Sequence, residues 1–97
     1  MILRVRPPSH PVRVVMQRAG YVEFRDPRTG DMSFTRRLGT YFYPRWHCYV
    51  DTGQETLTLN IHLDQKQPSY AGTTKHSGEY DGPAVEAEGH RLAVFFS

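Results

Sequence analysis

The stretch E-T-L-T-L-N-I-H-L-D-Q, residues 55–65, is the most regular alternating segment of the chain. Four aliphatic side chains share one of its faces: Leu57, Leu59, Ile61 and Leu63. The residues between them are polar, so His62 and Asp64 point together to the opposite face. A strict period of two is typical of a strand with one buried face and one polar face. We expect the rest of the chain to be organised around this strand.

The preceding segment alternates in the same way and predicts an antiparallel neighbour. Its apolar positions are Trp46, Cys48 and Val50, and its polar positions include Arg45, His47 and Tyr49. A Thr-Gly pair at 52–53 predicts a two-residue hairpin turn between the two strands. This turn places Cys48 opposite Leu57 on the buried face and His47 opposite Thr58 on the polar face.

Shorter alternating runs predict further strands at residues 2–6, 12–17 and 21–25. Prolines separate the first two runs, because proline removes a backbone donor and fixes φ. The sequence D-P-R-T-G at 26–30 contains the residues that hairpin turns require, and it leads into another strand. Pairing Phe24 with Met32 sets Val22 opposite Phe34, with Val22 and Phe24 on the inner face.

The sequence D-G-P at 81–83 predicts the start of a C-terminal helix, because a capping residue is followed by proline at the first helical position. The expected buried stripe of this helix is Val85, Gly89, Leu92 and Phe96, and the expected exposed residues are Glu86, Glu88 and Arg91. The terminal L-A-V-F-F could instead pair as a strand. A chain of 97 residues has room for one core, so we expect a single domain over residues 1–97. The predicted fold is α+β: a five- or six-stranded antiparallel sheet or half-barrel with one C-terminal helix.

Composition excludes several classes of protein. No apolar run approaches the length of a membrane span, and the N-terminus lacks the apolar stretch of a secretion signal. Together with a single cysteine, this predicts a cytoplasmic protein. Cys48 and His47 are neighbours on a strand and face opposite sides, so Cys48 is interpreted as a core residue and not as a nucleophile. The common hydrolase, P-loop and dinucleotide-binding motifs are missing from the sequence.

Two sequence blocks resemble segments of a family of small bacterial proteins. The first is R-R-L-G followed by F-Y-P-R-W-H, within residues 36–47, and the second is H-L-D-Q-K-Q-P-S-Y followed by H-S-G-E-Y-D-G-P, within residues 62–83. The resemblance extends over roughly two-thirds of the chain. It implies no catalytic residue, because no biochemical activity is known for the family. The family continues into an acidic, helix-like tail, whereas this chain has Gly89 and an apolar end.

The long polar segment at residues 66–82 directs the functional interpretation. Connections of this length are uncommon in compact domains and are usually functional or disordered. We expect a small binding or interaction domain, in preference to an enzyme, whose site combines the polar strand face with this segment. The expected ligand-binding residues are Tyr43, Arg45, His47, His62, Asp64, Tyr70, His76, Glu79 and Tyr80. The partner would be an unidentified small ligand or protein, and an open sheet edge also predicts a homodimer.

Metal binding, with or without catalysis, is the first alternative. His62 and Asp64 share a strand face, and the 66–82 segment could add His76 and Glu79. Imidazole and carboxylate groups suit zinc, manganese or iron. In the simpler interpretation, His62 and Asp64 hydrogen-bond to each other and hold the segment in place. The sequence itself identifies no cofactor.

Binding of single-stranded nucleic acid through residues 36–49 is the second alternative. Arginines alternate there with aromatic residues, which could hold phosphates while stacking bases. The residues concerned are Arg36, Arg37, Tyr41 and Arg45. The same aromatic rings could simply cover the second side of the sheet.

Overall fold

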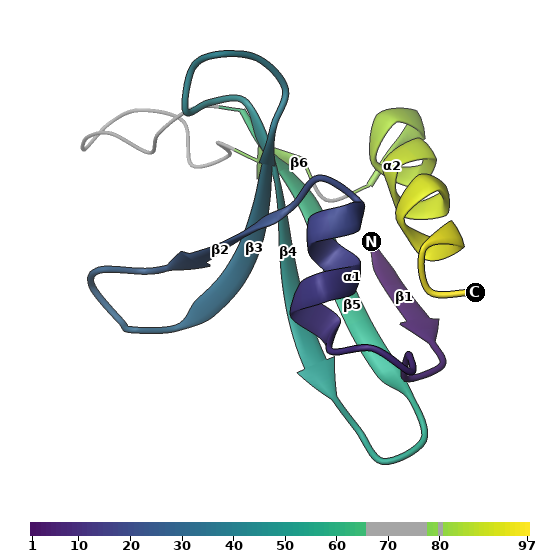
Figure 1. Ribbon diagram of the computed structural model, residues 1–97. Coiled ribbons are helices and arrows are strands. Elements are labelled where there is room, and N and C mark those ends of the chain that lie inside the picture. The colour runs from purple at the N-terminus through teal and green to yellow at the C-terminus, as the bar shows by residue number, and fades with distance from the viewer. Residues whose placement is uncertain (66–77, 80) are drawn as a thin grey trace.

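The computed structural model describes residues 1–65, 78–79 and 81–97 (Figure 1). Its strands are β1 (Ile2–Val5), β2 (Val22–Arg25), β3 (Met32–Arg37), β4 (Arg45–Thr52), β5 (Leu57–Asp64) and β6 (Gly78–Glu79), and its helices are α1 (Val12–Arg18) and α2 (Pro83–Val94). The strands form one antiparallel sheet in the order β1-β5-β4-β3-β2, and β6 pairs with the end of β5. The α+β prediction of an antiparallel sheet with a C-terminal helix is therefore confirmed.

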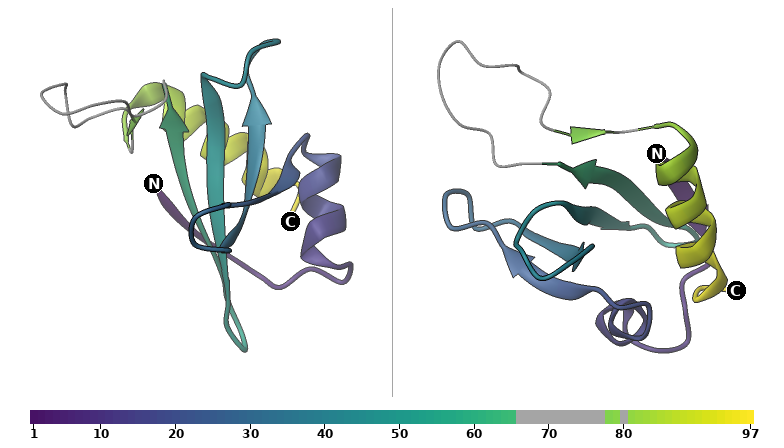
Figure 2. Two further views of the ribbon diagram at one scale, coloured as in Figure 1. Left: turned by 90° about the vertical axis from the view of Figure 1, so that its left-hand side faces the viewer. Right: turned by 90° about the horizontal axis from the view of Figure 1, so that it is seen from above.

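Both helices contribute to a core on one face of the sheet. Strand β5 supplies Leu57, Leu59 and Ile61, all fully buried, as the alternating pattern predicted. Helix α1 adds Met16, and α2 adds Leu92. Helix α2 crosses behind the strands in the left view of Figure 2. Burying each of these large aliphatic side chains stabilises the fold by about 1.5–3 kcal/mol, so this layer holds the sheet together and leaves its other face for polar groups.

The prediction of a strand at residues 12–17 is wrong, because this segment forms helix α1. Val15, Met16 and Ala19 are buried at the three- and four-residue spacing of a helical face. The carbonyl oxygen of Pro11 accepts the first hydrogen bonds of the helix, and Gly20 follows its end with a φ of 96°. Glycine adopts this left-handed conformation without strain and commonly ends a helix.

The hairpin between β2 and β3 is confirmed, but its predicted register is wrong by one residue. Phe24 lies opposite Ser33, and Met32 pairs with Arg25. Because side chains alternate between faces, this shift moves Phe24 to the polar face of the sheet. Val22 is exposed instead of facing inward.

The register of β4 against β5 also differs from the prediction, although each residue keeps its expected face. Cys48 lies opposite Ile61 instead of Leu57, and His47 lies opposite His62. The ladder continues to Thr52, and the backbone N–H of Gly53 donates to the carbonyl of Thr56 over 3.0 Å, so the turn lies at residues 54–55 and its predicted position at 52–53 is wrong. An even shift in register leaves every side chain on its original face. It does change which polar residues meet, and that change assembles the site.

Helix α2 begins at Pro83 as predicted and continues through Val94, so the alternative of a terminal strand is wrong. The predicted stripe of Val85, Gly89, Leu92 and Phe96 is buried. Gly89 is suited to its position because the side chains of Met1 and Leu3 occupy the space where a Cβ would lie. Among the described helices, none has the length and apolar character needed to cross a membrane.

Glu88 is buried, which corrects its predicted exposure. It accepts a hydrogen bond from Tyr21 Oη over 2.7 Å and two from Arg91 over 2.9 Å each. Burial raises the pKa of Glu88, but the hydrogen bonds from Arg91 and Tyr21 outweigh burial and hold that pKa below its usual value. Arg91 also donates to the carbonyl of Ala19 over 2.7 Å. This network fastens α2 to the segment between α1 and β2.

Candidate functional site

Two histidines and one aspartate converge on the sheet face opposite the helices. His47 on β4 lies directly opposite His62 on β5, and Asp64 follows two residues later on the same face. One possible ligand atom from each residue lies within 4.8 Å of the others. His47 is 7% exposed and His62 is 6% exposed, whereas the Asp64 side chain is 19% exposed. The cluster is therefore mostly buried, with Asp64 at its more open end.

Asp64 is the centre of this cluster. Its Oδ1 lies 2.8 Å from His62 Nε2, and its Oδ2 lies 3.1 Å from both His47 Nδ1 and Arg45 Nε. Partial burial raises the pKa of Asp64, but the donors on His47, His62 and Arg45 outweigh it and hold that pKa well below its usual range. Asp64 is consequently a carboxylate throughout the neutral range. The expectation that His62 and Asp64 interact on one strand face is confirmed.

Ser33 connects His47 to the neighbouring strands. Its Oγ lies 2.8 Å from His47 Nε2 and 3.3 Å from the carbonyl oxygen of Phe24, to which it donates. Ser33 was not predicted as a site residue, although its position between Met32 and Phe34 assigns it to the polar face. Pairing β3 with β4 was the information needed to place it beside His47.

Arg45 is enclosed by three aromatic rings. Its guanidinium carbon lies 4.8 Å from the centroid of Phe24, 4.3 Å from that of Phe42 and 4.8 Å from that of Tyr43. Only 5% of Arg45 is exposed, and its Nη1 is buried without a hydrogen-bond acceptor in the described part of the chain. The rings hold the guanidinium by cation–π contacts. Sequence reasoning found Tyr43 but missed Phe24 and Phe42, because the predicted register placed Phe24 in the core.

Tyr49 forms the exposed side of the cluster. Its ring centroid lies 4.5 Å from that of His47 and 6.0 Å from that of His62, and the rings of Tyr49 and His62 are stacked. Tyr49 is 43% exposed, whereas the two histidines beneath it are buried.

The structure brings together five of the predicted ligand-binding residues: Tyr43, Arg45, His47, His62 and Asp64. Tyr70, His76 and Tyr80 lie outside the described residues. Glu79 is described only as part of β6, where its backbone pairs opposite Leu63. Of the predicted metal ligands, His62 and Asp64 therefore meet, and His47 is the third member of the described cluster.

The residues of the nucleic-acid alternative do not share one exposed surface. Arg36 lies on the helix side of the sheet, where its Nη1 is 3.4 Å from Glu88 Oε1. Arg45 is buried, whereas Arg37 and Tyr41 are exposed. A platform for single strands needs its cations and rings on one accessible face, and this arrangement does not favour it.

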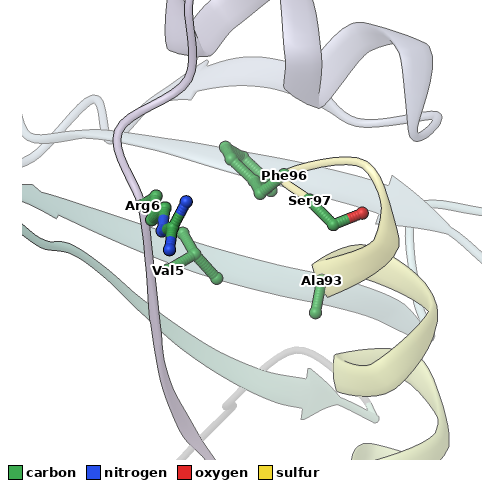
Figure 3. Close-up of a pocket in the computed structure, with 5 residues that line it drawn as sticks. All are labelled: Val5, Arg6, Ala93, Phe96 and Ser97. Carbon is green, nitrogen blue, oxygen red and sulfur yellow. The ribbon is translucent and has the colours of Figure 1, made fainter.

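Two other features lie on the helix side of the sheet. Cys48 is fully buried, and burial together with the negative charge of Glu88 raises the pKa of its thiol to about 12. This confirms Cys48 as a core residue. A cleft between the ends of β1 and α2 is lined by Val5, Arg6, Ala93, Phe96 and Ser97 (Figure 3). Neither feature adds a group to the histidine cluster.

No protein-family model, curated protein or solved structure matches the chain in the comparisons. The resemblance of residues 36–47 and 62–83 to small bacterial proteins thus stays a prediction.

Proposed function

We propose that the chain is a small binding domain that holds one divalent transition-metal ion, such as Zn²⁺, at His47, His62 and Asp64. The observation that carries this proposal is the convergence of two imidazoles and one carboxylate within 4.8 Å. This set of ligands suits zinc, manganese and iron. The three residues belong to two paired strands, so the backbone holds them in place before the ion arrives.

The hydrogen bonds around His47 support metal binding through its Nδ1. A neutral histidine has one protonated nitrogen, and the other nitrogen can bind a metal. With the proton on Nε2, His47 donates to Ser33 Oγ, and the serine hydroxyl donates to the carbonyl of Phe24. With these two hydrogen bonds, the lone pair on His47 Nδ1 is directed at the cluster. Histidine ligands are usually oriented through their second nitrogen in this way.

Without a metal ion, the same arrangement needs a proton between His47 Nδ1 and Asp64 Oδ2, which lie 3.1 Å apart. A purely structural cluster would retain that proton and bind no ion. A metal ion would replace it, because deprotonated nitrogen is the form that coordinates metals. The two interpretations are therefore separated by measuring metal affinity.

Calorimetric titration of the full chain with Zn²⁺ tests the proposal. We expect one ion to bind per chain, and His62→Ala to weaken binding by roughly a hundredfold or more, because it removes a ligand directly. His90→Ala is the matched control, since His90 is exposed on α2 and outside the cluster. The proposal is wrong if Zn²⁺ gives no saturable heat, or if the two variants bind Zn²⁺ equally well.

The proposed domain associates as a homodimer through β2. This strand ends the sheet, and none of the described strands pairs with its outer edge. Val22 on β2 is 59% exposed. An open edge presents unpaired backbone groups that a second copy of the same strand can satisfy.

A further inference from the structure

We infer that the metal site takes a small oxyanion, such as a carboxylate, as its external ligand, and that Arg45 holds this anion. The inference rests on the proposed metal site and identifies the chemistry of what that site would bind. Two independent observations carry it: the charge balance of the cluster and the unused donors of Arg45.

The charge balance favours an anion. Asp64 is the only carboxylate in the described cluster, and Arg45 already forms an ion pair with it. A divalent ion would therefore add two positive charges to a pair that is neutral. His47, His62 and Arg45 are each more than nine-tenths buried. Uncompensated charge is costly in such surroundings, so a further negative charge stabilises the loaded site.

The guanidinium of Arg45 has hydrogen-bonding capacity left for that anion. Arginine has five N–H donors in a planar fork. The Nε of Arg45 donates to Asp64 Oδ2, whereas its Nη1 is buried without an acceptor among the described residues. A buried donor of this kind destabilises the fold when it stays unpaired. An oxyanion supplies acceptors that suit the geometry of a guanidinium.

The guanidinium of Arg45 lies beside the metal ligands through its Nε. Asp64 Oδ2 interacts with both Arg45 Nε and His47 Nδ1, at 3.1 Å in each case. The guanidinium and the proposed ion therefore flank the same carboxylate. Three protein ligands leave at least one coordination position for an external group. An anion with two oxygens can use one on the metal and the other on Arg45.

The surroundings also limit the size of the anion. Phe24, Phe42 and Tyr43 surround the guanidinium, and Tyr49 borders the two histidines. These rings border the donors of Arg45 and the histidine pair closely, at ring distances of 4.3–4.8 Å. A carboxylate group or a small inorganic oxyanion is the class that fits.

Titration of the Co²⁺ complex of the full chain tests this inference. Co²⁺ serves as a visible substitute for the native ion, because its absorption spectrum depends on its ligands. We expect acetate and sulfate at millimolar concentrations to change the spectrum in a saturable manner and to tighten Co²⁺ binding at least tenfold. Chloride is the control anion, since it lacks the paired oxygens that a guanidinium recognises, and its effect should be much weaker. A preference for acetate over sulfate would identify the carboxylate class.

Substitutions of Arg45 and of Arg37 then distinguish a specific role of Arg45 in acetate binding from a general effect of positive charge. Arg45→Gln should weaken acetate binding to its own Co²⁺ complex at least tenfold, and Arg45→Lys should have an intermediate effect. Arg37→Gln is the matched control, because Arg37 also lies against Phe42 but is exposed. Should the Arg45 variants fail to fold, the comparison of acetate with chloride on the unmodified protein decides the question.

The outcomes are distinguishable. A Co²⁺ complex that responds no more to acetate than to chloride overturns the inference and leaves the metal site standing. Equal acetate affinity in Arg45→Gln and Arg37→Gln also overturns the role of Arg45. Failure of the unmodified protein to bind Co²⁺ or Zn²⁺ overturns both this inference and the proposed function.

Discussion

His47 lies directly opposite His62 across the β4–β5 ladder, and the centroids of their rings are 4.9 Å apart. The two histidines are far apart in sequence, and they meet because β4 pairs with β5. Asp64 joins the pair because it follows His62 on the same strand face. The proposed metal site thus exists because of the register between β4 and β5. Its metal affinity depends on the residues that maintain this register and orient the histidine rings.

Ser33→Ala is expected to weaken Zn²⁺ binding by about 10–100-fold, because the serine orients the ring of His47. Its effect on the free energy of unfolding should be smaller, about 1 kcal/mol. Calorimetric titration and urea unfolding measure the two quantities. Ser97→Ala is the control, since Ser97 is exposed and its hydroxyl donates to the carbonyl of Val94, outside the cluster. Equal Zn²⁺ affinity in both variants would contradict the role of Ser33.

Asp64→Asn is expected to destabilise the protein and to abolish tight Zn²⁺ binding. The change leaves the buried Arg45 without its counter-charge, which should cost about 2–4 kcal/mol of unfolding free energy. Urea unfolding in the absence of metal measures this loss. Asp51→Asn is the control, because Asp51 is exposed on β4. If both variants unfold at the same urea concentration, the ion pair does not contribute as described.

Glu88→Gln is expected to reduce the loss of stability in acid. The pKa of Glu88 lies below its usual value because Arg91 and Tyr21 hydrogen-bond to its charged form and outweigh the opposing effect of burial. A carboxyl with a lower pKa in the folded state adds stability above the unfolded pKa of about 4.3, and this stability is lost as the pH falls through the folded-state pKa.

Unfolding of Glu88→Gln should therefore depend less on pH below about 4.3, and its stability at pH 7 should be lower by about 2–3 kcal/mol. The acid dependence should not disappear, because the pKa of Asp64 is lowered as well. Glu86→Gln is the control on the exposed side of the same helix. Thermal melts from pH 2 to 7 make the comparison. Identical pH profiles for the two variants would show that the Glu88 network is not linked to folding.

Light scattering is expected to give a mass about twice the 11.2 kDa of the chain. Val22→Lys should shift the protein toward monomer, because lysine on an edge strand discourages pairing. Val94→Lys is the control, since Val94 is also an exposed valine but lies on helix α2 and not on β2. A monomer mass at high concentration of the unmodified protein would refute the dimer.

The faces of β4 and β5 could be predicted from the sequence, but their register could not. A period of two assigns Cys48 and Ile61 to one side and His47 and His62 to the other, whatever the offset between strands. Several even offsets satisfy that pattern equally well. Only the true offset places His47 opposite His62. The sequence therefore predicts which residues lie on the polar face, but it does not predict which of them meet.

The remaining errors have similar causes. The V-R-V-V-M run of α1 alternates like a strand, yet Val15 and Met16 also fit a helical face, and burial against the sheet decides between them. Glu88 is charged and was expected in solvent, but Tyr21 and Arg91 supply the hydrogen bonds that allow it to be buried. These partners are distant in sequence or unmarked by any motif, so only the folded chain reveals them.

Anomalous diffraction from crystals grown with Zn²⁺ tests the central claim most directly. Data collected above and below the zinc absorption edge locate the ion without reference to any assumed site. We expect one anomalous peak per chain, about 2.0–2.2 Å from His47 Nδ1, His62 Nε2 and an oxygen of Asp64. A peak at other residues, or none at this cluster while His47 still bonds to Asp64, would contradict the account.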